Sequence, residues 1–380
     1  MWHRDRTGHS GPPEATGRLA RIRALPAEEG SVDELLAATG DVSIEVVREA
    51  LARLAQLGCP GAAQVLRWRI WRADPSLVGY FARCIAALGD RDAIKEALTI
   101  LEDRGEDSSV YGERVAALAL LGAFSDPATI ATIRGALDDP MAAVRQTALV
   151  VLRRFPADAA TQRALIARLA DCDPQVRAAA VASVCALCRE PGAVLQELAG
   201  DESSVVRAAI ARAAARLGQK PSRLLLEDRE VGVRELTAEH AGACAVVPLA
   251  RAMRLDSSQP VRQAAARRLG ELHAEQATAE LLDALADPDS VVRVTVLGSM
   301  EAIHGGRLPG LLLDAIREPG REDRAALVYA LGRLDATCEL AALRDYPDPQ
   351  VQAALTFVRR ESQSTQAGPP TARESQSMRR

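Results

Sequence analysis

The sequence predicts an all-α protein built from stacked helical hairpins, an architecture called an α-solenoid. Three observations indicate this fold class. A motif of a turn followed by an apolar helix recurs along most of the chain, its copies lie about 30 residues apart, and the apolar residues within each copy follow helical spacing. Self-similarity at such a period is typical of repeat proteins, in which each unit buries its apolar face against its neighbours.

The recurring motif is clearest at residues 171–180, which read Asp-Cys-Asp-Pro-Gln-Val-Arg-Ala-Ala-Ala. Asp and Pro mark a turn, and Pro suits the first turn of a helix because its missing N–H would have no partner there. Val176 then begins a helix rich in Ala, Val and Leu. Variants of the same motif start at Asp139, Asp201, Asp256 and Asp287.

The units can be aligned on the valine that begins the second helix, or on the residue in its place. These anchors are Val47, Val78, Glu113, Val144, Val176, Val206, Val233, Val261, Val292, Asp323 and Val351. They lie 27 to 35 residues apart, a variation that loops absorb in stacked hairpins. Arg follows the anchor in all units except two, where Gly79 and Gln352 replace it.

Each unit contains two helices. After Val206, the residues Ala209, Ile210 and Ala213 form one apolar stripe, and a similar stripe precedes each turn. Glycines close several second helices, where we expect them to act as left-handed caps. These glycines are Gly58, Gly89, Gly122, Gly218, Gly270 and Gly332.

The composition favours closely packed helices. Of the 380 residues, 48% are hydrophobic but only 3% are aromatic, so Ala, Leu, Val and Ile must build the interior. We find no secretory signal and no run of about 18 apolar residues, and we therefore expect a soluble, cytoplasmic protein without a membrane span.

The seven cysteines are odd in number and irregular in spacing, which favours reduced, buried thiols. Cys185 and Cys188 have the spacing of a redox or metal pair, but no second pair or nearby histidine accompanies them. A zinc site requires four ligands, so we expect these two cysteines to pack in the interior and predict neither a metal nor a cofactor.

The pattern Asp-Pro-x-x-Val-Arg-x-x-Ala, closed by Leu-Gly, resembles the short bacterial HEAT repeat over residues 31–358. The resemblance implies a right-handed α-solenoid, an armadillo-like superhelix, of about eleven HEAT-like helical hairpins whose second helices line a concave face. Residues 1–30 are predicted to be a flexible leader that includes at most a short helix near 17–25. Residues 359–380, which are polar and contain Glu-Ser-Gln-Ser twice, are predicted to be a disordered tail.

The repeats predict a non-enzymatic scaffold or adaptor that binds another protein along the solenoid surface. No catalytic triad, phosphate-binding loop, dinucleotide fingerprint or calcium loop is recognisable, so no catalytic residue is assigned. The formal net charge is −4, which argues against a dedicated nucleic-acid binder. The sequence does not name the partner.

The arginine after each anchor has two interpretations, a binding ladder or a brace between units. We favour the brace, because an arginine beside an aspartate can join adjacent turns through charge-assisted hydrogen bonds. Under this interpretation Arg177 serves stability and does not bind a ligand.

Two groups of residues are candidate partner contacts. The first is the segment Arg67-Trp-Arg-Ile-Trp-Arg72, since Trp and Arg are enriched at interaction hot spots; we expect one tryptophan of this segment in the core and one on the surface. The second group consists of polar residues expected to be exposed on second helices. The complete set is Arg67, Trp68, Arg69, Trp71, Arg72, Arg153, Arg154, Arg212, Arg216, Glu235, Arg267 and Arg268.

Three alternatives stay open. Residues 31–58 also resemble a helix-turn-helix, although its recognition helix would carry Glu45, Arg48, Glu49 and Arg53, a poor charge balance for DNA. The chain could also resemble HEAT-like DNA glycosylases. That activity would require a carboxylate and aromatic residues on the concave face, and Asp74 near Trp71 is weak evidence for such a site. The repeats are also similar to bilin lyase subunits, but no bilin site is recognisable.

Overall fold

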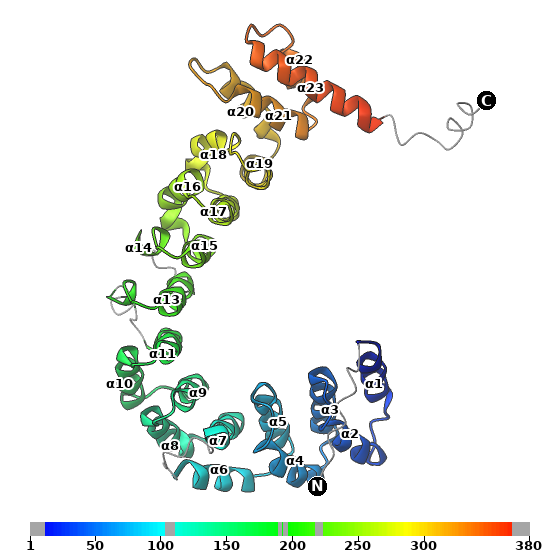
Figure 1. Ribbon diagram of the computed structural model, residues 1–380, viewed down its shortest axis with the longest axis vertical. Helices are drawn as coiled ribbons and strands as arrows, with labels where there is room; N and C mark the ends of the chain where they lie inside the picture. Colours follow the sequence, from blue (N-terminus) through cyan, green and yellow to red (C-terminus); the bar gives the residue numbers. More distant parts are fainter. Residues whose placement is uncertain (1–11, 103–110, 189–191, 193–196, 217–222, 367–380) are drawn as a thin grey trace, which may run out of the picture. The chain divides into compact units, whose positions relative to one another are not determined.

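The computed structural model describes residues 12–102, 111–188, 192, 197–216 and 223–366 (Figure 1). All regular secondary structure in these residues is helical. The chain divides into two compact units, residues 1–191 and residues 192–380.

The first unit alternates between outer and inner helices. Its α-helices are α1 (Pro12–Ala24), α2 (Val32–Ala38), α3 (Ile44–Leu57), α4 (Pro60–Ile70), α5 (Pro75–Ala87), α6 (Asp92–Glu102), α7 (Tyr111–Phe124), α8 (Ile130–Gly135), α9 (Ala142–Leu152), α10 (Ala159–Ala167) and α11 (Pro174–Leu187). Short 3₁₀ turns stand at η1 (Glu29–Ser31), η3 (Pro127–Thr129), η4 (Ala136–Asp138) and η5 (Arg168–Ala170).

The second unit continues the same alternation. Its α-helices are α13 (Ser204–Arg216), α14 (Arg223–Leu226), α15 (Val231–His240), α16 (Val246–Leu255), α17 (Gln259–Glu271), α18 (Thr278–Ala284), α19 (Ser290–His304), α20 (Leu308–Arg317), α21 (Arg324–Arg333), α22 (Thr337–Ala342) and α23 (Pro349–Gln366). Its 3₁₀ turns are η6 (Ala243–Ala245), η7 (Glu275–Ala277) and η8 (Gly305–Arg307).

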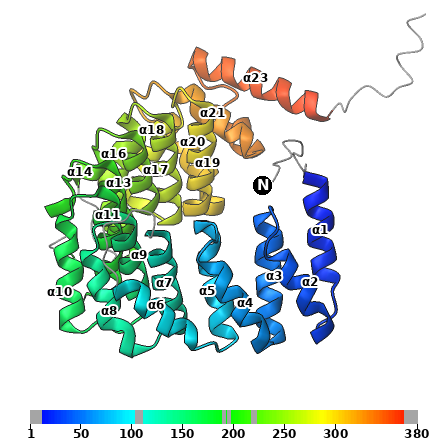
Figure 2. The same cartoon turned by 60° about the horizontal axis from the view of Figure 1, so that its bottom comes forward.

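Within each unit the helices form two layers. The second helices of the hairpins contact one another in sequence order, from α3 through α11 in the first unit and from α13 through α19 in the second. Figure 2 shows α3, α5, α7 and α9 side by side, with the first helices α4, α6 and α8 in front of them. The anchor residues Val144, Val176, Val261 and Val292 are fully buried between the layers. The predicted arrangement of helix, turn and helix is therefore confirmed.

Three of the glycines expected to be caps have a different role. Gly122, Gly270 and Gly332 lie inside their helices, where the neighbouring second helix approaches closely. A Cβ added at Gly270 would lie 2.7 Å from the Cβ of Ser299 and 2.9 Å from its Cα. The left-handed conformation falls three residues later, at Ser125, His273 and Asp335. Two glycines, Gly58 and Gly89, have the predicted left-handed conformation, with φ of 67° and 74°. Gly218 lies outside the described residues.

The N-terminal limit of the solenoid differs from the prediction of a flexible leader over residues 1–30. Helix α1 packs against α3, and Ile22 is buried in that contact. Arg18 Nε lies 2.8 Å from Asp41 Oδ2, and Arg53 Nη1 donates to the carbonyl of Arg23 at 2.5 Å. These contacts order a segment whose own sequence has only weak helical periodicity. Helix α1 covers the face of α3 that a preceding unit would cover.

The C-terminal limit also differs from the predicted boundary at residue 358. Helix α23 continues to Gln366, so the first part of the predicted tail is helical. Val351, Ala354, Leu355 and Val358 are buried and anchor this helix against the stack. Residues 367–380, the rest of the predicted tail, lie outside the described part of the chain.

The close approach at Gly270 predicts that Gly270→Ala weakens the second unit. The added methyl group must push α17 away from α19, and overpacking of this kind costs about 1–3 kcal/mol. Gly298→Ala is the matched control, because no atom lies within 4 Å of its added Cβ and α19 should gain about 0.5–1 kcal/mol. Urea unfolding of both variants checks this, and equal effects at the two sites would contradict the packing role of Gly270.

Candidate partner-binding surface

A series of arginine–aspartate contacts, here called the ladder, joins successive helical hairpins. Arg145 Nε and Nη2 donate to both oxygens of Asp171 in the next turn, at 2.9 and 2.7 Å. Its Nη1 donates to two carbonyls of its own turn, those of Asp139 and Pro140. The pairs with a carboxylate of the next turn are Arg114–Asp139, Arg145–Asp171, Arg207–Asp228, Arg234–Asp256, Arg262–Asp287 and Arg324–Asp348.

The ladder aspartates other than Asp348 each make three kinds of contact, as Asp228 illustrates. Asp228 accepts the guanidinium of Arg207, and its Oδ1 also accepts the backbone N–H of Glu230 at 2.8 Å, which caps the turn before α15. Its own carbonyl accepts Nη1 of Arg234. This arrangement confirms the interpretation of the repeated arginine as a brace. It also adds a detail, because the carboxylate that the arginine holds belongs to the following turn and not to its own.

Burial makes the ladder sensitive to the loss of one partner. Burial alone raises the pKa of the Asp171 and Asp228 carboxyls, but the hydrogen bonds and positive charges of Arg145 and Arg207 hold both pKa values below the ordinary 3.8. Arg207 is only 4% exposed. An uncompensated charge in such surroundings is strongly unfavourable.

The first candidate segment is divided between structural and exposed residues. Arg67 pairs with Asp90 and Glu96, and Arg69 donates to the carbonyl of Leu36 and the hydroxyl of Thr39. These two arginines hold α4 against its neighbours. Trp68 is 62% exposed and Arg72 lies over its ring, 4.6 Å from the centroid. Trp71 is half-buried, so neither tryptophan is a fully buried core residue. Helix α4 belongs to the outer layer (Figure 1).

The second candidate group also separates into two classes. Arg268 is tied down by the carbonyl of Ala241 and the carboxylate of Glu271, and Arg154 donates to the carbonyl of Gly122. Arg153 and Arg154 follow the last residue of α9 rather than lying on its face. Glu235 is half-buried on α15. The exposed members on second helices are Arg212, Arg216 and Arg267.

The helix-turn-helix alternative conflicts with the packing of α3. This helix packs between α1 and α5 in the same way that α5 packs between α3 and α7, so it occupies the place of a second helix in the stack. Its charged residues are engaged: the guanidinium of Arg48 lies 4.7 Å from the centroid of Tyr80, and Arg53 binds carbonyls at the end of α1. Residues 31–58 therefore behave as a first repeat.

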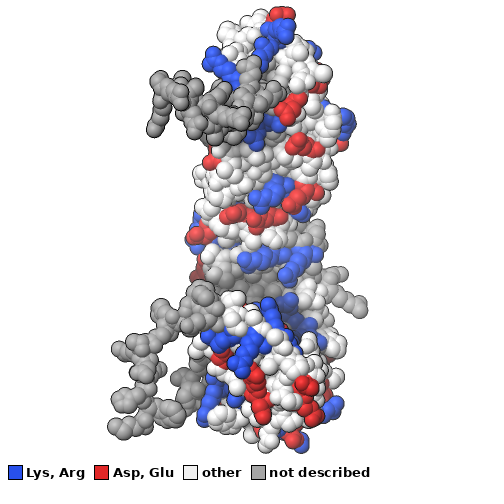
Figure 3. All heavy atoms as spheres, turned by 90° about the vertical axis from the view of Figure 1, so that its right-hand side faces the viewer, with Lys and Arg blue, Asp and Glu red and all other residues white. Residues whose placement is uncertain are grey.

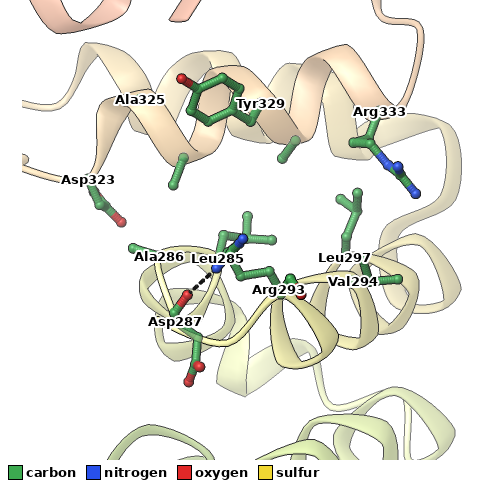
Figure 4. Close-up of a pocket in the computed structure, with 13 residues that line it drawn as sticks. Leu285, Ala286, Asp287, Arg293, Val294, Leu297, Asp323, Ala325, Tyr329 and Arg333 are labelled. Atoms are coloured by element: carbon green, nitrogen blue, oxygen red, sulfur yellow. Dashed lines mark hydrogen bonds between the residues drawn. The ribbon is translucent and has the colours of Figure 1, made fainter. Parts of the chain in front are cut away.

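Sequence reasoning missed two clefts. One, of about 610 Å³, lies in the first unit beside Tyr80, whose ring also contacts the guanidinium of Arg83 at 4.5 Å. The other, of about 590 Å³, lies in the second unit between α19 and α21, and Figure 4 shows Tyr329 and Arg333 facing it from α21. The second cleft could have been suspected from the sequence at Glu318, because the repeat pattern has an aspartate at this position.

The surface carries both charges. Figure 3 shows Lys and Arg sharing one face with Asp and Glu, separated by broad areas of other residues. In the parts of the chain that the structure describes, no group of three or more His, Cys, Asp or Glu side chains is placed to hold a metal ion.

The cysteines differ from the expectation of buried thiols. Cys84 is buried, and burial raises the pKa of its thiol to about 12. Cys172, Cys244 and Cys338 are exposed, while Cys185 and Cys188 are half-buried near the end of α11. All seven cysteines are free thiols. The expectation fails at three positions because these residues fall on turns and on short outer helices.

The comparisons with known proteins agree with this geometry. A model of HEAT repeats matches residues 106–183, 163–239 and 246–332, which together make up more than half of the chain. The chain belongs to the HEAT-repeat family. The predicted all-α solenoid and its resemblance to HEAT repeats are thereby confirmed. No curated protein matches the chain in sequence.

Several solved structures are similar to these HEAT repeats. Human deoxyhypusine hydroxylase in complex with glycerol is 20% identical with a TM-score of 0.29, over 77% of this chain and 99% of that one. An engineered protein is 18% identical with a TM-score of 0.33, over 91% and 94%. Kap121p bound to Nup53p is 12% identical with a TM-score of 0.36, over 92% and 45%. At these values, nothing about activity or partners transfers to this chain.

One further observation concerns membranes. Among the described residues, no helix combines the length and the apolar character that crossing a bilayer requires.

The ladder predicts that Arg207→Ala lowers the free energy of unfolding of the second unit by about 3 kcal/mol or more, because Asp228 is left buried without its partner. Arg293→Ala is the control, since Arg293 occupies the same place in its repeat but pairs with no carboxylate of a described residue. We expect it to cost about 1 kcal/mol. Hydrogen exchange of α13–α19 measures both, and equal losses would contradict the ladder.

The lowered pKa of Asp171 and Asp228 predicts a specific acid sensitivity. A carboxyl whose folded pKa lies below the unfolded value contributes stability above 3.8, and this stability is lost as the pH falls below 3.8. The contribution of these two carboxyls to the free energy of unfolding should therefore stay constant between about pH 5 and 7, as unfolding followed by circular dichroism can measure. Asp228→Asn should unfold more easily at neutral pH and show a weaker dependence below pH 3.8; an unchanged slope would count against this assignment.

Proposed function

We propose that the chain is a non-enzymatic scaffold that binds a partner protein along the exposed faces of its second helices. The repeated residues are engaged internally, since the anchor valines fill the core and the arginines brace successive turns. Specificity is then left to the residues that differ between repeats. Solenoids commonly bind partners through such cumulative surfaces.

The observation that carries this proposal is a set of large apolar side chains left exposed on second helices. A packed second helix contacts two neighbours and the outer layer, which leaves one free face. Exposed apolar residues concentrated on such a face are typical of protein-binding surfaces. They are Ile44, Tyr111, Val150, Val205, Val231, Val291, Val294, Tyr329 and Phe357.

Arginines accompany this apolar set. Arg212 and Arg216 lie on α13 with Val205, at spacings of seven and eleven residues that place them on one side of the helix. Apolar residues interspersed with arginine favour a protein partner, and the net charge of −4 argues against nucleic acid. The proposal that the chain is not an enzyme rests on the lack of a recognisable catalytic motif in its sequence.

The test compares two double variants of the full chain. Arg212→Ser with Arg267→Ser changes the inner layer, and Trp68→Ala with Arg72→Ala changes the outer layer. A partner protein is first identified by affinity purification from cells that make the chain, and its affinity is then measured with purified proteins. We expect the inner variant to weaken binding at least tenfold, which corresponds to about 1.4 kcal/mol, and the outer variant to change it less than twofold.

The opposite pattern, with binding lost only in the outer variant, would contradict the choice of the inner layer. Recovery of nucleic acid whose binding weakens steeply with salt would contradict a protein partner.

A further inference from the structure

The arginine ladder is interrupted at one step of the second unit. Arg207, Arg234 and Arg262 each hold the aspartate of the next turn with Nε and Nη2. After Arg293, the corresponding position is Glu318, whose carboxylate instead accepts from Arg321 Nη1 at 3.0 Å. No carboxylate among the described residues pairs with Arg293. This step therefore keeps the basic group of the ladder but lacks its acidic partner.

Arg293 is nevertheless held as the other ladder arginines are. Its Nη1 donates to the carbonyl of Asp287 at 2.7 Å (Figure 4) and to the carbonyl of Pro288 at 3.0 Å. Arg262 makes the equivalent bonds to its own turn while Nε and Nη2 bind a carboxylate. The remaining edge of the Arg293 guanidinium is thus a prearranged fork of two donors, which suits bidentate binding of a carboxylate.

The interruption coincides with the cleft between α19 and α21. Its volume of about 590 Å³ is within the range of sites that hold small ligands or side chains of a partner. Val294 and Leu297 line it from α19, and Tyr329 faces them from α21 (Figure 4). Val294 is 56% exposed and Tyr329 is 43% exposed. Arg293 lies among these apolar groups.

The charges around the cleft favour an anion. Two aspartates line it, but Asp323 is held by Arg321 at 2.7 Å and Asp287 by Arg262 at 2.7 Å. Arg293 and Arg333 also line the cleft, and neither forms an ion pair with a residue in the described part of the chain. The positive charge of the cleft is therefore uncompensated, while its negative charge is already paired.

We propose that this cleft binds a short segment of the partner protein. The segment places an aspartate or glutamate carboxylate on Nε and Nη2 of Arg293, and an adjacent apolar side chain against Val294, Leu297 and Tyr329. The bound carboxylate takes the place that an aspartate of the next repeat takes elsewhere in the ladder. This inference rests on the proposed function, because it assumes that the chain binds a protein.

An extended segment fits this site better than an isolated anion. The ring of Phe357 meets Tyr329 edge-on at 5.5 Å between centroids, so the apolar surface continues from the cleft onto α23. Phe357 is itself half exposed. A peptide that starts at Arg293 can therefore add apolar contacts beyond Tyr329.

The test uses the full chain and two pools of fluorescent peptides. In one pool an aspartate is flanked on either side by leucine or phenylalanine, and in the other an asparagine replaces the aspartate. Fluorescence anisotropy should show that the aspartate pool binds at least tenfold more tightly. Arg293→Gln should abolish this preference, whereas Arg317→Gln, which changes an exposed arginine on the outer helix α20, should preserve it. Thermal unfolding verifies that both variants are folded.

Equal binding of the two pools, or an unchanged preference in Arg293→Gln, would overturn the proposal. It would also be overturned if Glu374→Gln in the full chain tightened peptide binding tenfold, because the occupant would then be the chain's own C-terminal segment. Sedimentation velocity provides a third check: a parent dimer that Arg293→Gln dissociates would identify a second copy as the occupant.

Binding of the whole partner protein to the parent and to Arg293→Gln distinguishes a failure of this inference from a failure of the proposed function. If the partner binds the parent and Arg293→Gln equally well, the cleft proposal is wrong and the scaffold proposal holds. If no partner protein is recovered while the peptide pools still discriminate, the scaffold proposal is wrong and the carboxylate site holds.

Discussion

The contact on which this structure depends is the buried arginine–aspartate pair between successive turns. The guanidinium of Arg145 binds two carbonyls of its own turn and the carboxylate of Asp171 in the next, and that carboxylate also accepts a backbone N–H of the turn before the following helix. Burial of the Arg145–Asp171 pair is tolerated because each nitrogen of the guanidinium and each oxygen of the carboxylate has a partner. The same contact sets the spacing of neighbouring hairpins, since the arginine reaches only one turn. Gly270, which lets α17 and α19 approach closely, complements this spacing farther along the helices.

The repeated contact divides the chain into residues that build the solenoid and residues that are free to vary. Arg69 and Arg268 are engaged with carbonyls of neighbouring hairpins, although their sequence context gave no reason to separate them from Arg72 or Arg267. The break in the ladder at Glu318 shows how a change in one side chain converts a structural position into an accessible one. A glutamate, longer by one methylene, pairs with Arg321, and the arginine of the preceding turn then borders an open cleft.

The first and last repeats of the described chain depart from the pattern. Helix α1 covers the first repeat with Ile22 and an ion pair to Asp41. At the other end, Gln352 replaces the ladder arginine and its Nε2 donates to three carbonyls near its own turn. Helix α1 thereby covers a surface that an internal repeat would bury against its neighbour, whereas the Gln352 amide only keeps bonds to carbonyls near its own turn.

The sequence by itself determined the all-α solenoid, the helix–turn–helix unit, the anchor valines and the bracing role of the arginine, because these follow from periodicity and from local turn chemistry. Only the tertiary structure showed where neighbouring hairpins approach closely and where they leave a cleft. Gly122, Gly270 and Gly332 were mistaken for caps because helix contact distances are not encoded in local sequence. The packing of α1 against α3 and the clefts beside Tyr80 and Tyr329 were missed for the same reason. They arise where segments distant in sequence meet, and a local sequence pattern does not indicate whether two helices touch or leave space between them.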